Sequence, residues 1–123
     1  MASITFPDIR ENAVLGDPEL LNALKAIDPD WGDLVGRCAG EVWGKPLISQ
    51  KVKAMIVIAV DVVNTNVGPA PYYAHLEMAF KQGITHAEVR ELLLFMSIYA
   101  GFNKVATAIT SFNQFLLENG DKK

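Results

Sequence analysis

The residue best suited to acid–base chemistry in this sequence is His75. On a helix it would share its face with Pro71, Tyr72, Met78 and Ala79, which lie three or four residues away. The imidazole is therefore expected to face aromatic and apolar side chains rather than bulk water. Histidine titrates near neutral pH, which suits it to transferring a proton. A histidine on an apolar face is more often a satisfied core residue, so both interpretations stay open from spacing alone.

Two charged residues interrupt the apolar stretch 52–63, Lys53 near its start and Asp61 near its end. Burying a lone carboxylate is costly, so Asp61 needs a partner such as Lys53, a tyrosine hydroxyl or water. It could serve structure or catalysis. Lys53, Lys45 and Arg37 are candidates for binding an anionic substrate, and ordinary solvated charge is the alternative for each. Lys53 is the preferred anchor because it enters an otherwise apolar helix.

Aromatic side chains surround this candidate site in sequence. Tyr72, Tyr73 and Tyr99 offer hydroxyl groups, although aromatic residues at helical spacing more often belong to a core. Trp43 is expected to pack against the core or a subunit interface, with stacking on substrate as the alternative.

Histidine and cysteine content argues against a metal site. His75 and His86 are too far apart in sequence for a paired ligand motif, and Cys38 is the single cysteine. We expect His86 to be exposed in the first turn of a helix. A lone cysteine excludes an intrachain disulfide and fits a reducing, cytoplasmic environment.

Composition predicts a folded, soluble domain. The chain has 123 residues, of which 50% are hydrophobic and 20% are charged, enough for one core and too few for two domains. The net charge of -3 and the lack of a basic cluster argue against a nucleic-acid surface.

The longest uncharged stretches, 54–60 and 92–103, are shorter than the roughly 18–20 residues of a membrane span. The N-terminus lacks the apolar core of a signal peptide. A mean hydropathy of +0.19 is high for so short a chain, which favours a homo-oligomer that buries apolar surface between subunits.

Residues typical of helix starts and helix ends recur along the chain and predict an all-α domain. We expect a loosely held N-terminal arm over residues 1–16 and a single helical domain over 17–120. The capping patterns at Asp17, Asp28 and Thr85 mark three helix starts. The predicted helices cover 18–27, 29–43, 49–64, 70–82, 86–100 and 103–118. The third is apolar almost all round, which predicts a helix surrounded by others.

Three segments resemble the carboxymuconolactone decarboxylase family. The stretch 73–91 contains His75-Leu76, an alanine-bearing helix, Gly83 and a capping box that leads into a Glu-rich turn. The segment 98–102 resembles the family's tyrosine–small–glycine break. The segment 40–46 resembles the acidic-x-Trp-x-basic-Pro turn of the γ-carboxymuconolactone decarboxylase branch. Together they cover most of residues 38–112.

This resemblance implies a compact bundle of about six helices of the alkylhydroperoxidase D type, assembled as a homotrimer or homohexamer. It implies a cofactor-independent lyase that decarboxylates or isomerises a small anionic lactone or enone-like ring. His75 would be the general acid/base and Glu41 its catalytic partner, with a helix-surface pair to Arg37 as the alternative for Glu41. The residues expected to bind substrate are Lys53, Tyr72, Tyr99 and Trp43.

The sequence also departs from its relatives. Where the alkylhydroperoxidase D branch carries Cys-x-x-Cys, this chain has Gly68 and Pro71, so thiol peroxidase chemistry lacks its reactive pair. The basic turn at 50–53 is not Arg-rich, and the loop before His75 is longer and proline-rich, which predicts a different substrate. Two alternatives stay open: a non-catalytic helical oligomer that binds a small molecule or acts as a scaffold, and an accessory cyclase or lyase in a biosynthetic pathway.

Overall fold

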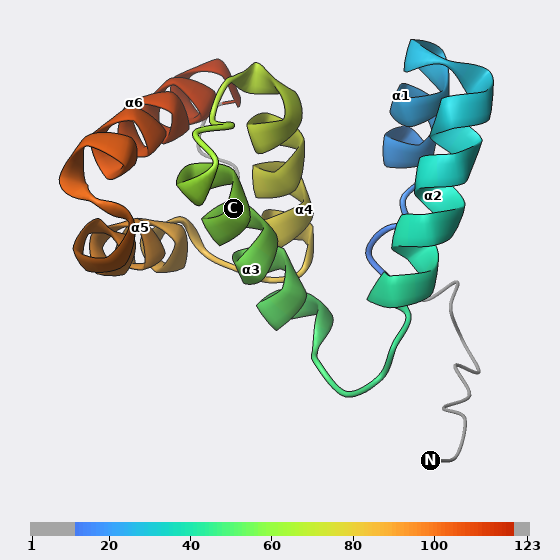
Figure 1. The fold of residues 1–123 in the computed structure, drawn as a ribbon, viewed down its shortest axis with the longest axis horizontal. Helices are drawn as coiled ribbons and strands as arrows, with labels where there is room; N and C mark the ends of the chain where they lie inside the picture. Colours follow the sequence, from blue (N-terminus) through green and yellow to red (C-terminus); the bar gives the residue numbers. More distant parts are fainter. Residues whose placement is uncertain (1–11, 120–123) are drawn as a thin grey trace. The chain divides into compact units, whose positions relative to one another are not determined.

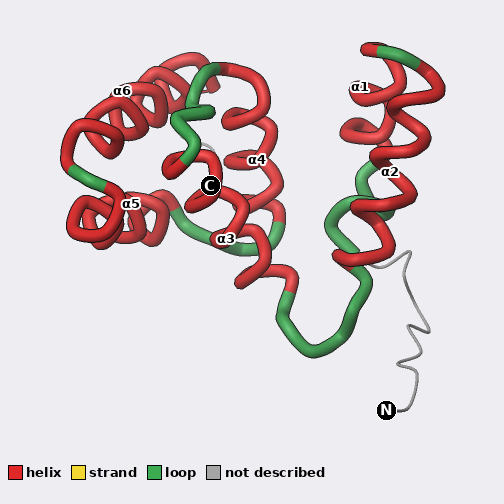
Figure 2. The backbone as a smooth tube through the Cα atoms, viewed as in Figure 1, coloured by secondary structure: helices red, strands yellow, loops and turns green. Residues whose placement is uncertain are grey.

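The structure, a computed structural model, describes residues 12–119, and every regular element within that range is helical (Figures 1 and 2). Six α-helices and one short π-helical turn follow one another along the chain. They are α1 (Pro18–Ile27), α2 (Pro29–Trp43), α3 (Gln50–Val63), η2 (Pro69–Tyr73), α4 (Ala74–Lys81), α5 (His86–Ala100) and α6 (Phe102–Asn119). The all-α prediction is confirmed, and the predicted helix boundaries lie within a few residues of these. None of these helices is both long and apolar enough to cross a membrane.

The chain forms two compact units, Met1–Gln50 and Lys51–Lys123. The expected division into an arm over 1–16 and one domain over 17–120 stays a prediction. Most of that arm lies outside the described residues. Its last part, from Asn12, forms a turn whose first three residues are buried.

The first unit is a helical hairpin in which α1 and α2 lie antiparallel (Figure 1). Asp17 caps α1 by accepting a hydrogen bond from the amide of Leu20 at 3.1 Å. Asp28 caps α2 in the same way, from the amide of Trp31 at 2.8 Å. Each cap satisfies an amide that the first turn of a helix leaves without a partner. Both capping predictions are therefore confirmed.

Glycine allows the two helices of the hairpin to approach closely. A Cβ atom placed on Gly32 would lie 2.5 Å from the Lys25 amide nitrogen and 2.6 Å from the Leu24 carbonyl carbon. These are backbone atoms that cannot rotate away. Position 32 on α2 therefore requires glycine for α2 to approach α1 this closely.

Side-chain hydrogen bonds close the other end of this unit. Asn12 donates from Nδ2 to the Gly40 carbonyl at 3.0 Å, and its Oδ1 accepts from the amides of Val14 and Leu15. Gln50 accepts from the Ala13 amide at 2.7 Å and donates to the Trp43 carbonyl at 2.7 Å. These bonds hold residues 12–16 and the turn after α2 in place.

The second unit packs α3 to α6 around a shared apolar core (Figure 1). Its largest fully buried side chains include Tyr72, Leu76, Leu93 and Phe112. The capping box at the start of α5 is present as predicted. Glu88 accepts from the Thr85 amide at 2.9 Å, and the Thr85 hydroxyl accepts from the Glu88 amide at 3.1 Å.

Helix α3 differs from its prediction in one respect. Ala54, Ile58 and Val62 are buried, as expected, on one face. The opposite face is only half-buried, since Val52, Ile56, Val60 and Val63 each stay about half exposed. Within the second unit, the neighbouring helices therefore cover one side of α3, and this unit does not surround α3 by itself.

Candidate active site

A carboxylate and an imidazole from two neighbouring helices meet in the second unit. Nδ1 of His75 on α4 lies 2.5 Å from Oδ2 of Asp61 on α3. The Asp61 side chain is 7% exposed and the His75 side chain is 25% exposed. The acid is thus buried, whereas part of the imidazole reaches the surface.

The chemistry of the two groups assigns the roles of the ring nitrogens. A carboxylate has no proton to give, so Nδ1 carries the proton and donates it to Asp61. In the neutral ring, Nε2 then holds the lone pair and can accept a proton. A carboxylate behind an imidazole also fixes the ring orientation and stabilises the imidazolium when it forms. The pair is therefore suited to moving protons at Nε2.

Local sequence explains why Asp61 points inward. It stands three residues after Ile58 and seven after Ala54, which places the three on one buried face of α3. Two contacts at the end of α3 hold this turn in place. The Asn66 amide donates to the Asp61 carbonyl at 2.8 Å, and Nζ of Lys104 donates to the Val63 carbonyl at 2.8 Å.

His75 is positioned by the turn that precedes it. Tyr72, in η2, is fully buried and donates its hydroxyl proton to the Ala108 carbonyl on α6 at 3.1 Å. Burial raises the pKa of Tyr72 well above its usual value, and the negative charge of Asp61 raises it further. The hydroxyl therefore stays protonated and anchors η2 to α6. Since Tyr72 lies one helical turn before His75, this anchor holds the start of α4 beside α3.

Similarity to known proteins agrees with this arrangement. Residues 29–113 match the sequence pattern of the carboxymuconolactone decarboxylase family, and this stretch includes both Asp61 and His75. The chain belongs to the carboxymuconolactone decarboxylase family. Membership supports a decarboxylase-like function at the level of the family.

A named relative points the same way. The chain is 32% identical over 92 residues to a 4-carboxymuconolactone decarboxylase of Acinetobacter baylyi (strain ATCC 33305 / BD413 / ADP1). This match covers 72% of the chain and 67% of the relative. No solved structure matches the chain.

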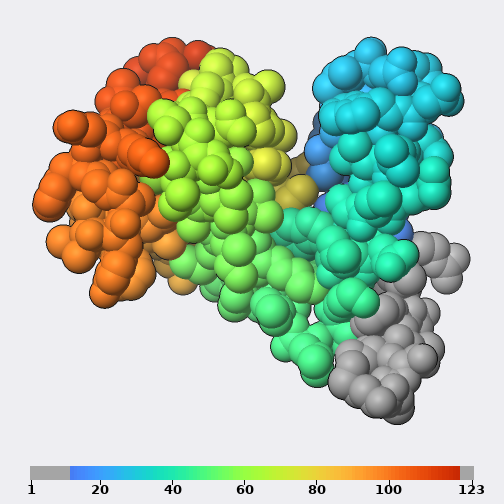
Figure 3. All heavy atoms as spheres, viewed as in Figure 1, coloured from blue at the N-terminus to red at the C-terminus, as the bar shows by residue number. Residues whose placement is uncertain are grey.

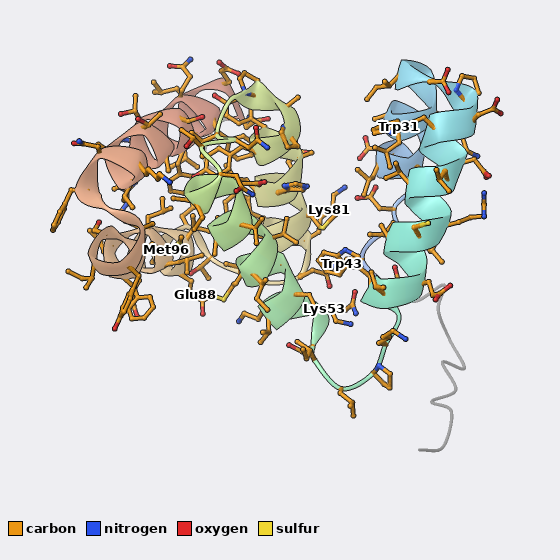
Figure 4. All side chains as sticks on the ribbon, viewed as in Figure 1. Trp31, Trp43, Lys53, Lys81, Glu88 and Met96 are labelled. Carbon is orange, nitrogen blue, oxygen red and sulfur yellow. The ribbon has the colours of Figure 1, made fainter. Side chains whose placement is uncertain are left out.

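The other residues predicted from the family resemblance lie in varied surroundings. Lys53 is half-buried near the start of α3 (Figure 4). Tyr72 uses its hydroxyl in the bond to α6. Tyr99 is exposed on α5, with its ring 5.2 Å from that of Phe95. Trp43 is buried at the end of α2, and its substrate-binding role stays a prediction.

Glu41 is exposed on α2, in the first unit. The alternative partner suggested for it, Arg37, instead pairs with Asp33 at 2.9 Å. That hydrogen bond and the charge of Asp33 raise the pKa of Arg37. Glu41 as a catalytic partner of His75 remains a prediction, while the carboxylate that contacts Nδ1 belongs to Asp61.

The second histidine corrects an expectation. His86 was expected to be exposed, but its ring is partly buried, with its centroid 4.7 Å from that of Phe80. Its Nε2 atom is buried without a hydrogen-bond partner. The aromatic side chains of α4 and α6 attract this ring because α5 begins beside them. Within residues 12–119, no cluster of three or more histidine, cysteine or acidic side chains could hold a metal ion.

A surface hollow of about 240 Å³ lies in the first unit, around the turn between α2 and α3. Its lining includes Lys45, one of the cationic residues considered for substrate binding, together with Asn12, Ser49 and Gln50. The amide groups of Asn12 and Gln50 are already used in the bonds that hold this turn. The hollow is thus a feature of the turn, and neither residue of the imidazole–carboxylate pair lines it.

Proposed function

We propose that this chain is a cofactor-independent acid–base enzyme that decarboxylates or isomerises a small carboxylated lactone. The observation that carries the proposal is the His75–Asp61 pair: a buried carboxylate holding a partly exposed imidazole at 2.5 Å. Family membership and the similarity to a 4-carboxymuconolactone decarboxylase support the substrate class.

The proposed decarboxylation needs a proton donor close to the reacting carbon, which the His75 imidazolium can supply. In the decarboxylation, the bond between the ring carbon and the carboxylate breaks and carbon dioxide leaves. The electron pair moves onto the conjugated lactone carbonyl as an enolate. A proton from Nε2 of the His75 imidazolium then adds to carbon, and solvent restores that proton. One proton is consumed for each carbon dioxide released.

Asp61 has two roles in this proposal. It holds the ring through Nδ1, so that Nε2 faces the reacting carbon. It also compensates the positive charge of the imidazolium, which a partly buried site would otherwise disfavour. Such general acid catalysis contributes roughly 10²–10⁴-fold.

Lys53 is the proposed anchor for the substrate carboxylate. It lies eight residues before Asp61 on the same helix, about 12 Å along the axis. Glu41, Trp43 and Tyr99 are retained as proposed contacts from the family resemblance, and the assembly is proposed to be a homotrimer or homohexamer.

The first experiment measures carbon dioxide release from 4-carboxymuconolactone by the purified full chain. His75→Ala should lower turnover at least ~100-fold, because it removes the proton donor. The matched control is His86→Leu, which removes the other histidine and should leave turnover unchanged. Circular dichroism of each variant checks that the fold is intact. Unchanged turnover in a folded His75→Ala protein would exclude the acid–base role.

The pH dependence of turnover distinguishes the two reactions. Decarboxylation needs the imidazolium as proton donor, so turnover should fall as rising pH converts it to the neutral ring. Isomerisation begins with a neutral ring that removes a proton, so turnover should fall as decreasing pH protonates the ring. A turnover that does not change with pH would contradict both.

A further inference from the structure

Water can reach the proton-accepting nitrogen of His75. The Asp61 carboxylate contacts Nδ1, which leaves Nε2 for a second partner. In residues 12–119, the one side-chain nitrogen or oxygen atom that is buried without a hydrogen-bond partner is Nε2 of His86. Nε2 of His75 is not buried in this way and makes no hydrogen bond to the described residues, so the 25% exposure of this side chain includes Nε2.

The chain that joins the two residues of the pair also lies at the surface. Residues 63–66 and 68–70 are exposed. In Figure 3 the yellow-green region, which contains the end of α3 and the loop before α4, forms an outer surface of the second unit. The carboxylate of the pair is therefore buried, whereas the imidazole borders solvent.

His86, the other histidine of the chain, has different surroundings. Its ring packs against aromatic side chains, with its centroid 4.7 Å from that of Phe80 and 6.3 Å from that of Phe112. Its Nε2 is buried, so water does not reach this atom. Of the two histidines, both of which the structure describes, only His75 combines an open Nε2 with a carboxylate at Nδ1.

This geometry suits the neutral His75 ring to act as a base toward water. The lone pair on Nε2 accepts a proton as the water oxygen attacks a carbonyl carbon, and Asp61 compensates the positive charge that develops on the ring. In the decarboxylation proposed above, the ring gives a proton to carbon, whereas here it takes a proton from water. The two reactions therefore start from opposite protonation states of the same ring.

The chemistry of the pair determines which esters it can hydrolyse. A base at Nε2 makes water a stronger nucleophile toward the carbonyl carbon. An alkyl ester also needs an acid that protonates the departing alkoxide. An ester of a phenol or an enol needs less help, because the leaving oxygen departs as a stabilised anion. Aryl esters, enol esters and enol lactones are therefore the expected class of substrate.

We propose that the His75–Asp61 pair also hydrolyses aryl and enol esters, including enol lactones. Nε2 removes a proton from water, and the water oxygen forms a bond to the carbonyl carbon. The tetrahedral intermediate then collapses, and the bond to the phenol or enol oxygen breaks. The leaving oxygen takes the proton back from Nε2, so each turnover consumes one water and yields one carboxylic acid and one phenol or enol. This activity shares the pair with the proposed function and does not depend on decarboxylation.

The first test measures release of nitrophenolate from p-nitrophenyl acetate by the purified full chain, after subtraction of the rate without protein. The wild type should release many equivalents per chain, faster than the same concentration of free imidazole. His75→Gln should lower the rate at least ~100-fold, because it removes the base and keeps an amide that can donate to Asp61. Asp61→Asn should lower the rate at least ~10-fold, since the imidazolium that forms loses its compensating charge.

His86→Leu is the matched control, because it removes the histidine whose Nε2 is buried, and its rate should equal that of the wild type. Circular dichroism checks that each variant is folded. A wild type no faster than free imidazole, or a folded His75→Gln protein with the wild-type rate, overturns the proposal. Loss of the activity in folded His86→Leu and not in His75→Gln would place the reaction at another residue and also overturn it.

A second test distinguishes water activation from direct attack by the ring. With His75 acting as a base, the rate should fall in heavy water, because a proton moves in the step, and intact-mass spectrometry should find no acetyl group on the chain after turnover. Release that stops after one equivalent and leaves an acetylated chain overturns the proposal. Carbon dioxide release from 4-carboxymuconolactone is measured on the same samples. A chain that releases carbon dioxide and no nitrophenolate overturns this inference and leaves the proposed function intact.

Discussion

Replacing Asp61 with asparagine tests the site most directly, because the change removes a charge and keeps the shape of the side chain. The carboxylate contacts Nδ1 of His75 at 2.5 Å, so its charge lies within about 4 Å of the centre of the imidazolium charge. At an effective dielectric constant of about 20, two unit charges at that distance attract by about 4 kcal/mol. Each ~1.4 kcal/mol corresponds to a factor of ten, so the pair stabilises the reacting imidazolium by up to ~10³-fold.

We expect Asp61→Asn to lower the turnover of carbon dioxide release by about 10²–10³-fold. The lower limit allows for water, which reaches a ring that is 25% exposed and replaces part of the lost stabilisation. Stability should change by about 1 kcal/mol or less, because the substitution also removes a charge from a buried position. Steady-state kinetics and thermal unfolding measure the two effects separately.

Two further measurements make the result decisive. Asp33→Asn is the control, since that carboxylate forms an exposed ion pair with Arg37 and should affect neither quantity. Nitrogen-15 NMR of the histidine rings should find the proton of neutral His75 on Nδ1 in the wild type. If folded Asp61→Asn keeps more than about a third of wild-type turnover, or if the His75 proton resides on Nε2, the carboxylate does not support the imidazole as argued.

Two other predictions concern the fold. Gly32→Ala should destabilise the protein by about 2 kcal/mol or more in denaturant unfolding, because its Cβ would lie 2.5 Å from backbone nitrogen of α1. Gly36→Ala, where the nearest atom is a flexible Leu21 methyl at 3.0 Å, should be close to neutral, and equal losses for both would contradict the close approach at Gly32. The hydrogen bond from the Thr85 amide lowers the pKa of Glu88 from its usual 4.5. The charged form of Glu88 therefore stabilises the fold above pH 4.5. This contribution disappears as the pH falls through the lower pKa that Glu88 has in the folded protein. Wild type should therefore be more stable than Glu88→Gln at pH 7, with the difference closing below pH 4.5 in urea titrations, and a difference that widened on acidification would refute the sign.

The helices were predictable because their ends carry local signals. Asp17, Asp28 and Thr85 each form the cap that their sequence context predicts, through bonds to amides three residues away. Contacts between distant segments had no such signal. The hydrogen bond from Tyr72 to Ala108 spans 36 residues, and nothing in the local pattern pairs those two positions.

The candidate site was predicted in part. His75 could be identified from its apolar helical face and from the family resemblance, and burial of Asp61 followed from the apolar helix around it. The sequence pattern predicts that Asp61 has a partner, with Lys53, a tyrosine hydroxyl or water as candidates, whereas the carboxylate contacts His75 in the structure. The two residues could have been paired from the sequence. A buried acid on one helix and a histidine on the apolar face of the next both require a hydrogen-bond partner, and each can supply it to the other. Glu41 was predicted as the partner of His75 because its segment resembles a motif of the family. Such a resemblance gives no information about the distance between the Glu41 carboxylate and the His75 ring.

The loop between α3 and α4 determines whether this pair can exist. Asp61 and His75 are 14 residues apart, and much of the intervening chain is the loop that contains Pro69 and Pro71. Both ends of the segment are fixed independently, by the Asn66 amide on the Asp61 carbonyl and by the Tyr72 hydroxyl on α6. The bonds that anchor the loop are therefore separate from the groups that would transfer a proton. We therefore expect substitutions at Gly68 or Pro69, which are exposed between these anchors, to leave the imidazole and its carboxylate together.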